Sequence, residues 1–353
     1  YEKDVRKFPS EYLWNYKIWK YTDEKQVLII SDGKAGHLHQ SQAAAALLSE
    51  ALAQRRIKAS ISTVEIRLKN KLSKTILAVA AFFSGKYSCQ GCMSCLRMSL
   101  ATKDCQILHH SHPDFVISCG SLGSMVNRMV SRENLSKSIT ILKPAFAGLR
   151  KFDLVVMPRH DRPRRKKNVA VIEGALNLID KNYLAAQVAG LVRVKGEGLS
   201  GKEKILCIGL LIGGDTKNFR LSKEDISLVI AQIKQQAESI NADILVTTSR
   251  RTPAEIEELV KKEFSAYPRC KLLVIANEKN IPGTMEAILG SSDIAVVSAE
   301  SISMVSEAAS SGKYVIVFES AVDAKHRRFL NNMGDKKYIY LIPAQAIGEK
   351  IGF

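Results

Sequence analysis

Hydrophobic residues gather in short runs along this 353-residue chain, and segments with a helical spacing of apolar positions separate the runs. The first half holds such runs at residues 26–30, 59–64, 115–118 and 152–157. The second half holds them at residues 205–212, 243–247, 272–276, 294–298 and 314–318. Short apolar runs that alternate with helical segments are typical of buried parallel strands. The pattern therefore predicts an α/β protein with parallel sheets.

The length of the chain predicts two domains, because a single hydrophobic core stops growing at about 250–300 residues. Residues 195–202 are rich in glycine and charge, and we expect them to be the linker between the domains. This division gives a basic, aromatic extension at residues 1–24, an N-terminal Rossmann-like domain at 25–195 and a C-terminal Rossmann-like domain at 203–330. The last segment, residues 331–353, is expected to return to the N-terminal domain.

A polar loop that contains glycine follows the first predicted strand of each half, at residues 31–37 and 213–218. Ligands of open α/β sheets bind at the carboxyl ends of the strands, so both loops are candidate ligand sites. Neither loop has the G-x-G-x-x-G pattern of dinucleotide-binding sites. Nicotinamide and flavin cofactors are therefore disfavoured.

Three loops of the second half have residues that suit an anion. The loop at 213–218 has two glycines, which let the backbone approach a phosphate closely, and a lysine. The segment 247–253 carries two arginines among hydroxyl residues, and 298–307 puts further hydroxyls at a predicted helix start. Helix capping or a solvated surface would account for one such loop alone. Three of them on one sheet edge favour a site for a phosphate or diphosphate.

The charge of the chain favours an anionic partner. There are 52 lysine and arginine residues against 35 aspartate and glutamate residues, a net charge of +17. Nucleic acid, an anionic membrane and acidic substrates all fit this charge, but no RNA- or DNA-binding module is recognisable, which disfavours nucleic acid. Residues 1–24 hold both tryptophans, Trp14 and Trp19, among basic residues. This segment suits a membrane interface, and an extension packed on the protein surface explains it equally well.

The chain is not expected to span a membrane or to be secreted. Its longest weakly charged stretch, residues 76–90, contains a lysine and is shorter than the ~20 residues of a spanning helix. No apolar signal-peptide segment is evident near residue 1. We therefore expect a cytoplasmic protein with free thiols, peripheral at the inner face of a membrane.

Four cysteines have a spacing known from metal sites. They form a C-x2-C-x2-C-x9-C pattern of Cys89, Cys92, Cys95 and Cys105. The flanking residues are apolar and helical in pattern, and cysteine packs well as a small hydrophobic residue. We therefore favour thiols in a helical, membrane-facing hairpin over a zinc or iron–sulfur centre.

Five ordered motifs between residues 26 and 330 resemble the ELM-type mitochondrial fission proteins of plants and their bacterial relatives, a family assigned to the glycosyltransferases. The motifs are Asp32-Gly33-Lys34-x-Gly36-His37-x-x-Gln40, Phe152-Asp153-Leu154-Val155-Val156-x-Pro158-Arg159-His160-Asp161, Gly213-Gly214, Thr247-Thr248-Ser249-Arg250-Arg251-Thr252-Pro253 and Ser301-x-Ser303-Met304-x-Ser306-Glu307-Ala308.

The resemblance implies a GT-B fold, with two Rossmann-like domains whose parallel sheets face an interdomain cleft. The C-terminal domain would bind a nucleotide-sugar donor and the N-terminal domain an acceptor. No metal or other cofactor is implied, because helix dipoles and basic side chains neutralise the leaving group. The donor-binding residues would be Gly213, Gly214, Lys217, Asn218, Thr248, Ser249, Arg250, Arg251, Ser301, Ser303, Met304, Ser306 and Glu307. Glu307 is similar in position to the acidic residue that commonly binds ribose hydroxyls in this fold.

In the N-terminal half, the acceptor-side residues would be Gly33, Lys34, Gly36, Arg159 and Asp161. A transferase needs a general base for the acceptor hydroxyl, and the candidates are Asp32, His37 and His160. Asp32 would alternatively hold the turn or cap the helix, and His160 would alternatively bridge the domains.

These observations predict a metal-independent glycosyltransferase that moves a sugar from a nucleotide-sugar donor to a lipid-linked or envelope-glycan acceptor at an anionic membrane. A non-enzymatic membrane scaffold that retains the fold is the alternative, and a nucleotide-sugar epimerase is a third hypothesis. A scaffold has no reason to keep Arg250, Arg251 and Glu307 together, which favours an enzyme.

Overall fold

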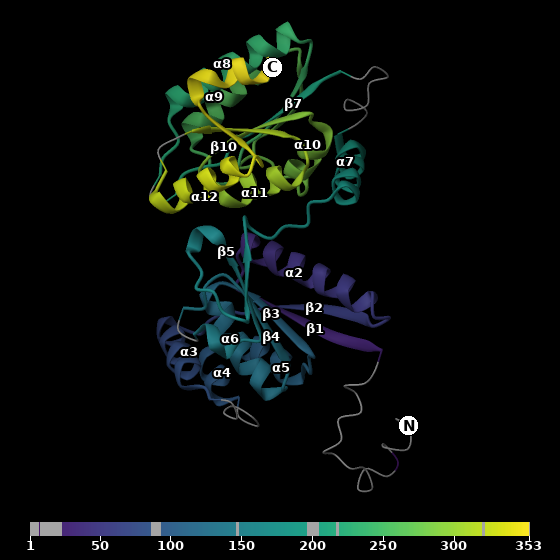
Figure 1. The fold of residues 1–353 in the computed structure, drawn as a ribbon, viewed down its shortest axis with the longest axis vertical. Helices are drawn as coiled ribbons and strands as arrows, with labels where there is room; N and C mark the ends of the chain where they lie inside the picture. Colours follow the sequence, from purple (N-terminus) through teal and green to yellow (C-terminus); the bar gives the residue numbers. More distant parts are fainter. Residues whose placement is uncertain are drawn as a thin grey trace. The chain divides into compact units, whose positions relative to one another are not determined.

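The structure is a computed structural model, and it describes Lys7 and residues 23–85, 93–145, 148–195, 205–216, 219–319 and 322–352. The chain forms two compact units. The first unit runs to Val156 and includes residues 166–170, and the second contains residues 157–165 and everything from Val171 onward. Each unit is built around one six-stranded sheet (Figure 1).

The sheet of the first unit has the strand order β2-β1-β3-β4-β5-β6. Its strands are β1 (Glu24–Ser31), β2 (Lys58–Glu65), β3 (Phe115–Cys119), β4 (Lys137–Ile141), β5 (Leu154–Pro158) and β6 (Val169–Ile172). The neighbours from β2 through β5 pair in parallel. The four apolar residues at 27–30 in β1 are each only 1% exposed, as expected for a strand covered on both faces.

In the described part of this first unit, five α-helices connect and cover the strands. They are α2 (Ala35–Ala53), α3 (Lys71–Phe83), α4 (Ser94–Ser99), α5 (Thr102–His110) and α6 (Gly120–Glu133). Asn70 caps the start of α3. Its side chain accepts a hydrogen bond from the Ser73 amide, and the Ser73 hydroxyl accepts one from the Asn70 amide, so the two residues form a capping box. Two single 3-10 turns, η2 (Leu149–Lys151) and η3 (Arg159–Asp161), flank β5.

The sheet of the second unit is parallel throughout and has the order β12-β11-β10-β7-β8-β9. Its strands are β7 (Cys207–Leu211), β8 (Asp243–Thr247), β9 (Cys270–Val274), β10 (Ile294–Ser298), β11 (Tyr314–Glu319) and β12 (Tyr340–Pro343). Its helices are α7 (Lys181–Lys195), α8 (Lys223–Ser239), α9 (Ala254–Phe264), α10 (Thr284–Ser291), α11 (Ile302–Ser310), α12 (Ala324–Asp335) and α13 (Ile347–Ile351), with a 3-10 turn η4 (Ala344–Ala346).

The core of this second unit has two layers, because alternate strand residues face opposite sides of the sheet. Apolar residues of α8, α9 and α13 pack on one face, and those of α7, α10, α11 and α12 pack on the other. Val296 and Val297, adjacent in β10, lie in different layers. The carboxyl ends of β7, β8 and β10 thus form one edge that helices on both faces hold in place.

The domain boundary differs from the expected one. Helix α7, expected in the N-terminal domain, packs on α10 and places Leu184 and Leu191 in the core of the second unit. The segment 331–353, expected to return to the N-terminal domain, also stays in the second unit, since β12 extends its sheet and Ile347 packs in its core. In both cases the segment covers apolar surface that the second sheet leaves open. Most of the expected linker at 195–202 lies outside the described residues.

The cysteine pattern is only partly described. Cys95 lies in α4 and is half-buried, and Cys105 lies in α5 and is buried, both as free thiols. Cys89 and Cys92 lie outside the described residues. Within the described part of the chain, no three metal-ligating side chains gather, and no helix is both long and apolar enough to cross a bilayer.

Candidate functional site

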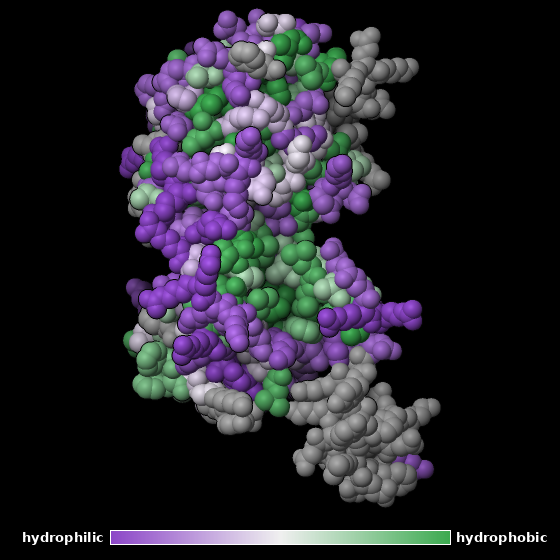
Figure 2. Space-filling view, in the orientation of Figure 1, coloured by the Kyte–Doolittle hydropathy of each residue, from purple (hydrophilic) through white to green (hydrophobic). Residues whose placement is uncertain are grey.

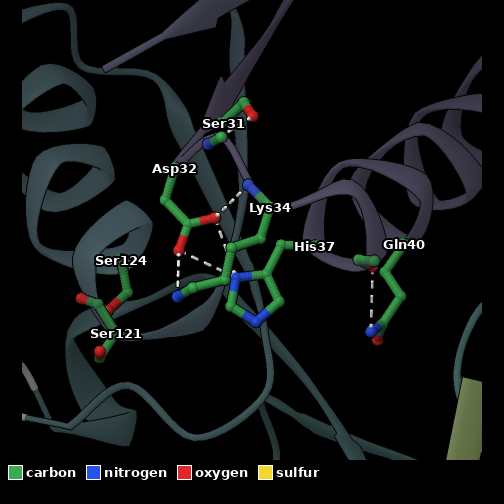
Figure 3. Close-up of polar contacts among 9 residues, drawn as sticks. Ser31, Asp32, Lys34, His37, Gln40, Ser121 and Ser124 are labelled. Atoms are coloured by element: carbon green, nitrogen blue, oxygen red, sulfur yellow. Dashed lines mark hydrogen bonds and ion pairs between the residues drawn. The ribbon is translucent and has the colours of Figure 1, made fainter. Parts of the chain in front are cut away.

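The loop after β1 holds an aspartate–histidine pair (Figure 3). The Asp32 side chain is 2% exposed, and both of its carboxylate oxygens lie 3.0 Å from Nδ1 of His37. Lys34 Nζ also donates to Asp32, at 2.9 Å. Burial alone would raise the pKa of Asp32, but the hydrogen bonds and positive charges of Lys34 and His37 outweigh it and hold this pKa below its usual value. Asp32 is thus an ionised group that orients His37 rather than a free base.

The second ring nitrogen of His37 points away from Asp32 (Figure 3). The side chain is 23% exposed, and Nε2 has no hydrogen-bond partner among the described residues. A hydrogen bond from Nδ1–H to Asp32 leaves Nε2 as the basic nitrogen. Of the three candidate bases, His37 therefore has the geometry of a proton acceptor, and Asp32 is placed to orient it.

The start of α6 closes the other side of the imidazole. Gly120 has φ +77°, and a Cβ at this position would lie 2.5 Å from Cε1 of His37. No side chain caps α6, and none caps α2, which carries His37. Two helix N-termini with free backbone amides therefore lie at this edge, where they favour negative charge. Sequence reasoning missed Gly120, although an apolar run followed by glycine and serine residues signals such a helix start.

The other acceptor-side residues of this loop are exposed. Gly33 has φ +78° and lies beside Glu65, Lys34 extends from the loop with its side chain 69% exposed, and Gly36 lies in the first turn of α2. Gln40 is buried, and its amide donates to the carbonyl of Gly36. The loop thus presents backbone and one lysine around the histidine.

The side chains of the residues after β5 form their contacts inside the second unit. Arg159 forms a two-pronged ion pair with Glu173, with both distances 2.9 Å, and Asp161 binds Lys325 at 2.7 Å. His160 is 6% exposed, packs edge-to-face on Phe329, and has its pKa lowered to about 4 mainly by burial. These residues stabilise the second unit, and His160 lacks the exposure that a general base needs.

In the second unit, the loop after β7 is shaped by neighbouring loops. A Cβ on Gly213 would lie 1.8 Å from Oε1 of Glu300, and one on Gly214 would lie 2.1 Å from the carbonyl carbon of Arg251. The Gly213 amide donates to Ser298 at 2.7 Å. The two glycines are therefore required by packing, whatever ligand the loop binds. Lys217 and Asn218 lie outside the described residues.

The loop after β8 has two kinds of side chain: hydroxyl groups that hold the backbone, and exposed arginines. Thr248 is buried and accepts a hydrogen bond from the Ala276 amide at 2.9 Å, and Ser249 accepts one from the Arg251 amide at 3.1 Å. Arg250 and Arg251 are exposed, and their guanidinium groups have no hydrogen bond or ion pair within the described residues. These two cations are thus available for a phosphate.

The run after β10 begins α11. Ser301 caps this helix by accepting a hydrogen bond from the Met304 amide, and the Met304 side chain is 8% exposed in the core. Ser306 accepts from the Ala175 amide at 2.9 Å and so holds the segment after β6. Ser303 is half-buried. Of the hydroxyls expected at the donor, Ser303 is the one without a structural hydrogen bond within the described residues.

Two carboxyl groups in this second unit have raised pKa values. Burial, with a smaller contribution from the charge of Glu286, raises the pKa of Glu307 to about 8. Burial also raises the pKa of Glu300, which is 2% exposed and whose Oε2 has no hydrogen-bond partner in the described part of the chain. Sequence reasoning missed Glu300, which directly follows β10 and accepts from Ser298 at 2.8 Å. With a pKa of about 8, Glu307 is mostly protonated at pH 7 and is then able to donate a hydrogen bond.

Comparison with known proteins identifies relatives of the chain. The family described as Mitochondrial fission ELM1 matches residues 35–350. An uncharacterized protein of Rickettsia prowazekii is 22% identical over 340 residues, which cover 88% of each chain. The mitochondrial fission protein ELM1 of Arabidopsis thaliana is 25% identical over 278 residues, covering 71% of this chain and 62% of the plant protein.

Among solved structures, the UDP-GlcNAc 2-epimerase of Methanocaldococcus jannaschii superposes with a TM-score of 0.52 at 10% identity. The superposition covers 93% of this chain and 90% of that one. The likeness concerns the fold, which is a GT-B-like arrangement of two Rossmann-like units, each with a parallel six-stranded sheet and flanking helices.

Proposed function

Because the chain belongs to the mitochondrial fission ELM1 family and has a GT-B-like fold, we propose that it is a metal-independent glycosyltransferase. It transfers a sugar from a nucleotide-sugar donor, bound by the second unit, to a lipid-linked or envelope-glycan acceptor at the cytoplasmic face of a membrane. The solved relative named above acts on a nucleotide sugar, which supports a donor of this class. The net charge of +17 supports an anionic membrane as a partner.

The observation that carries the proposal is the Asp32–His37 pair, whose Nε2 has no hydrogen-bond partner among the described residues. In the proposed step, this nitrogen takes the proton of the acceptor hydroxyl while the hydroxyl oxygen attacks the anomeric carbon of the sugar. The bond from that carbon to the donor phosphate breaks, and the nucleotide leaves with the electron pair. Arg250 and Arg251 stabilise the charge of the leaving group, as do the backbone amides at the start of α11.

A non-enzymatic scaffold is the second candidate, and the description of the family as mitochondrial fission proteins favours it. A scaffold needs its folded surface alone. Asp32 also holds its own loop by accepting from the Lys34 amide, but Nε2 of His37 and the guanidinium groups of Arg250 and Arg251 make no hydrogen bond within the described residues. An ionised aspartate that orients an exposed histidine is the arrangement of a proton-transfer site, which favours the enzyme.

Thermal shift with a panel of nucleoside diphosphates and nucleotide sugars tests donor binding. We expect stabilisation by one nucleotide class, and Arg250→Ala should weaken that binding by about 1.5 to 3 kcal/mol through loss of a charge-assisted hydrogen bond. Arg269→Ala is the matched control. Arg269 lies just before β9, at the opposite edge of the same sheet, and its guanidinium group donates a hydrogen bond to Asn241. If no nucleotide of the panel stabilises the chain, the scaffold becomes the better proposal.

A further inference from the structure

Helix α3 leaves a large apolar face uncovered. Leu72 is 71% exposed, Val79 52%, Phe82 61% and Phe83 76%. These four positions recur at helical spacing, so they lie along one face. The opposite face, with Ser73, Leu77 and Ala81 at 0% exposure, packs on the first unit. Leucine and phenylalanine side chains in this number at the surface of one short helix indicate a contact with an apolar medium or partner.

The face is a shaped surface rather than a set of loose side chains. A shallow groove of about 380 Å³ runs over it, lined by Lys74, Thr75, Ala78, Val79, Phe82 and Phe83. The rings of Phe82 and Phe83 contact each other edge to face, with centroids 5.1 Å apart. Lys151 fixes the end of the helix by donating to the carbonyl of Ala81 at 3.0 Å and to that of Phe82. The two rings therefore project from a helix that is held at both ends, since Asn70 caps its start.

The charged residues of the segment that carries this face have one sign. Lys71 and Lys74 are exposed on α3 itself, and the helix contains no acidic residue. The sequence from residue 66 to 103 contains seven lysines and arginines and no aspartate or glutamate. In Figure 2, light-green hydrophobic residues lie at the edge of the molecule where Figure 1 shows α3 and α4, beside purple hydrophilic ones. Aromatic and aliphatic side chains flanked by cations are the pattern of helices that lie in the interface of an anionic bilayer.

We propose that this face of α3, defined by Leu72, Val79, Phe82 and Phe83 with Lys71 and Lys74, is a docking surface for an anionic lipid bilayer. Phe82 and Phe83 enter the boundary between headgroups and acyl chains, and the two lysines contact lipid phosphates and carboxylates. The proposal gives the membrane part of the proposed function a location, but it does not depend on sugar transfer. A protein partner would need acidic side chains opposite these lysines, and a second copy of this positively charged chain presents the same cations.

Vesicle co-sedimentation of the full chain tests the surface, with phosphatidylcholine vesicles that contain or lack phosphatidylserine. We expect binding to the phosphatidylserine vesicles that weakens with salt. The double variant Phe82→Ser/Phe83→Ser should bind about tenfold more weakly, because both side chains lose apolar contact with the bilayer. Lys71→Gln/Lys74→Gln should lower binding by roughly tenfold at low salt.

Two control double variants remove apolar or lysine side chains at exposed positions outside α3. Leu47→Ser/Leu228→Ser changes two exposed apolar residues of α2 and α8, and Lys58→Gln/Lys223→Gln removes two other exposed lysines. The proposal is overturned if these controls lower binding as much as the α3 variants, if no vesicle binds the chain, or if the α3 variants instead dissociate an oligomer in light scattering. Thermal shift with nucleotides is read on the same proteins. Loss of vesicle binding with normal nucleotide binding, or the reverse, separates this proposal from the proposed function.

Discussion

At the scale of single residues, the candidate base depends on a difference in burial between two residues that lie five positions apart in the sequence. Asp32 is almost wholly enclosed and satisfied by Lys34 and His37, whereas His37 keeps part of its ring accessible. An ionised carboxylate held in this way fixes the tautomer of the histidine. In the proposed reaction, Asp32 would therefore orient the imidazole and His37 would accept the proton.

We predict that His37→Gln lowers turnover about 10²-fold or more, since general-base catalysis contributes about 10² to 10⁴. Asp32→Asn should lower it by a similar factor, because an amide cannot stabilise the imidazolium charge. Steady-state kinetics measures both effects, and nucleotide binding should stay unchanged. The control is His39→Gln, which changes an exposed histidine two residues further along α2. Equal turnover of the His37 and His39 variants would place the base elsewhere.

Glu307 predicts a pH dependence of stability. Burial raises its pKa from the ordinary value of 4.5 to about 8 on folding, so the folded state binds the proton more tightly than the unfolded state. Its contribution to stability is therefore complete below about pH 4.5 and is lost as the pH rises through 8, at a cost of ~5 kcal/mol at most. Urea denaturation at several pH values should show this loss in the wild type and not in Glu307→Gln. Glu258→Gln, which changes an exposed glutamate of α9, should retain the wild-type slope.

At the scale of elements, the loops of the second unit hold one another. The carbonyl of Gly213 accepts from Thr252 and its amide donates to Ser298, so one glycine joins the loops that follow β7, β8 and β10. The exposed arginines of the second loop take their position from this junction. The shape of the candidate donor site is thus a property of three loops together.

We predict that Gly214→Ala destabilises the ligand-free protein by more than ~2 kcal/mol, because the added methyl group overlaps the backbone of Arg251. Gly36→Ala is the matched control. A Cβ at this position meets nothing within 4 Å, and the residue lies in helix α2, where alanine is neutral or stabilising. Urea denaturation compares the two. A Gly214→Ala protein as stable as the wild type would mean that the loop adjusts freely, and the glycine would then serve a ligand instead.

At the scale of the whole molecule, the positive charge acts as a long-range attraction to anionic surfaces. Residues 1–22, apart from Lys7, lie outside the described residues, so their contribution is argued from composition. They combine both tryptophans of the chain with basic residues, as membrane-interface segments do. This segment and the α3 face would give the chain two membrane contacts.

We predict that Trp14→Ser/Trp19→Ser lowers binding to phosphatidylserine vesicles by about tenfold, because tryptophan favours the interface between water and lipid. Co-sedimentation at low and high salt measures the change, and the variant should keep the salt dependence that the lysines provide. Tyr338→Ser removes an exposed aromatic residue of the second unit and should leave binding unchanged. A tryptophan variant that binds like the wild type would assign the segment to the protein surface.

Much of the fold followed from local patterns. The apolar runs at 26–30 and 205–212 contain the buried parts of β1 and β7, and the loops after them lie at the carboxyl ends of those strands, as predicted. The domain limits did not follow, because the sequence of α7 does not show which of the two sheets this helix covers. Its assignment to the second unit depends on contacts of Leu184 and Leu191 with residues far away in the sequence.

The sequence by itself determined the class of the fold and the family, because hydrophobic periodicity and ordered motifs are local properties that survive without coordinates. Only the tertiary structure decided which motif residues remain free. Arg159, Asp161, Ser306 and Thr248 bear the same chemical groups as free site residues, yet each has a partner between 14 and 164 positions away in the sequence. Partners at such distances meet only when the strands are ordered into a sheet, and this ordering is what leaves His37, Arg250 and Arg251 available for chemistry.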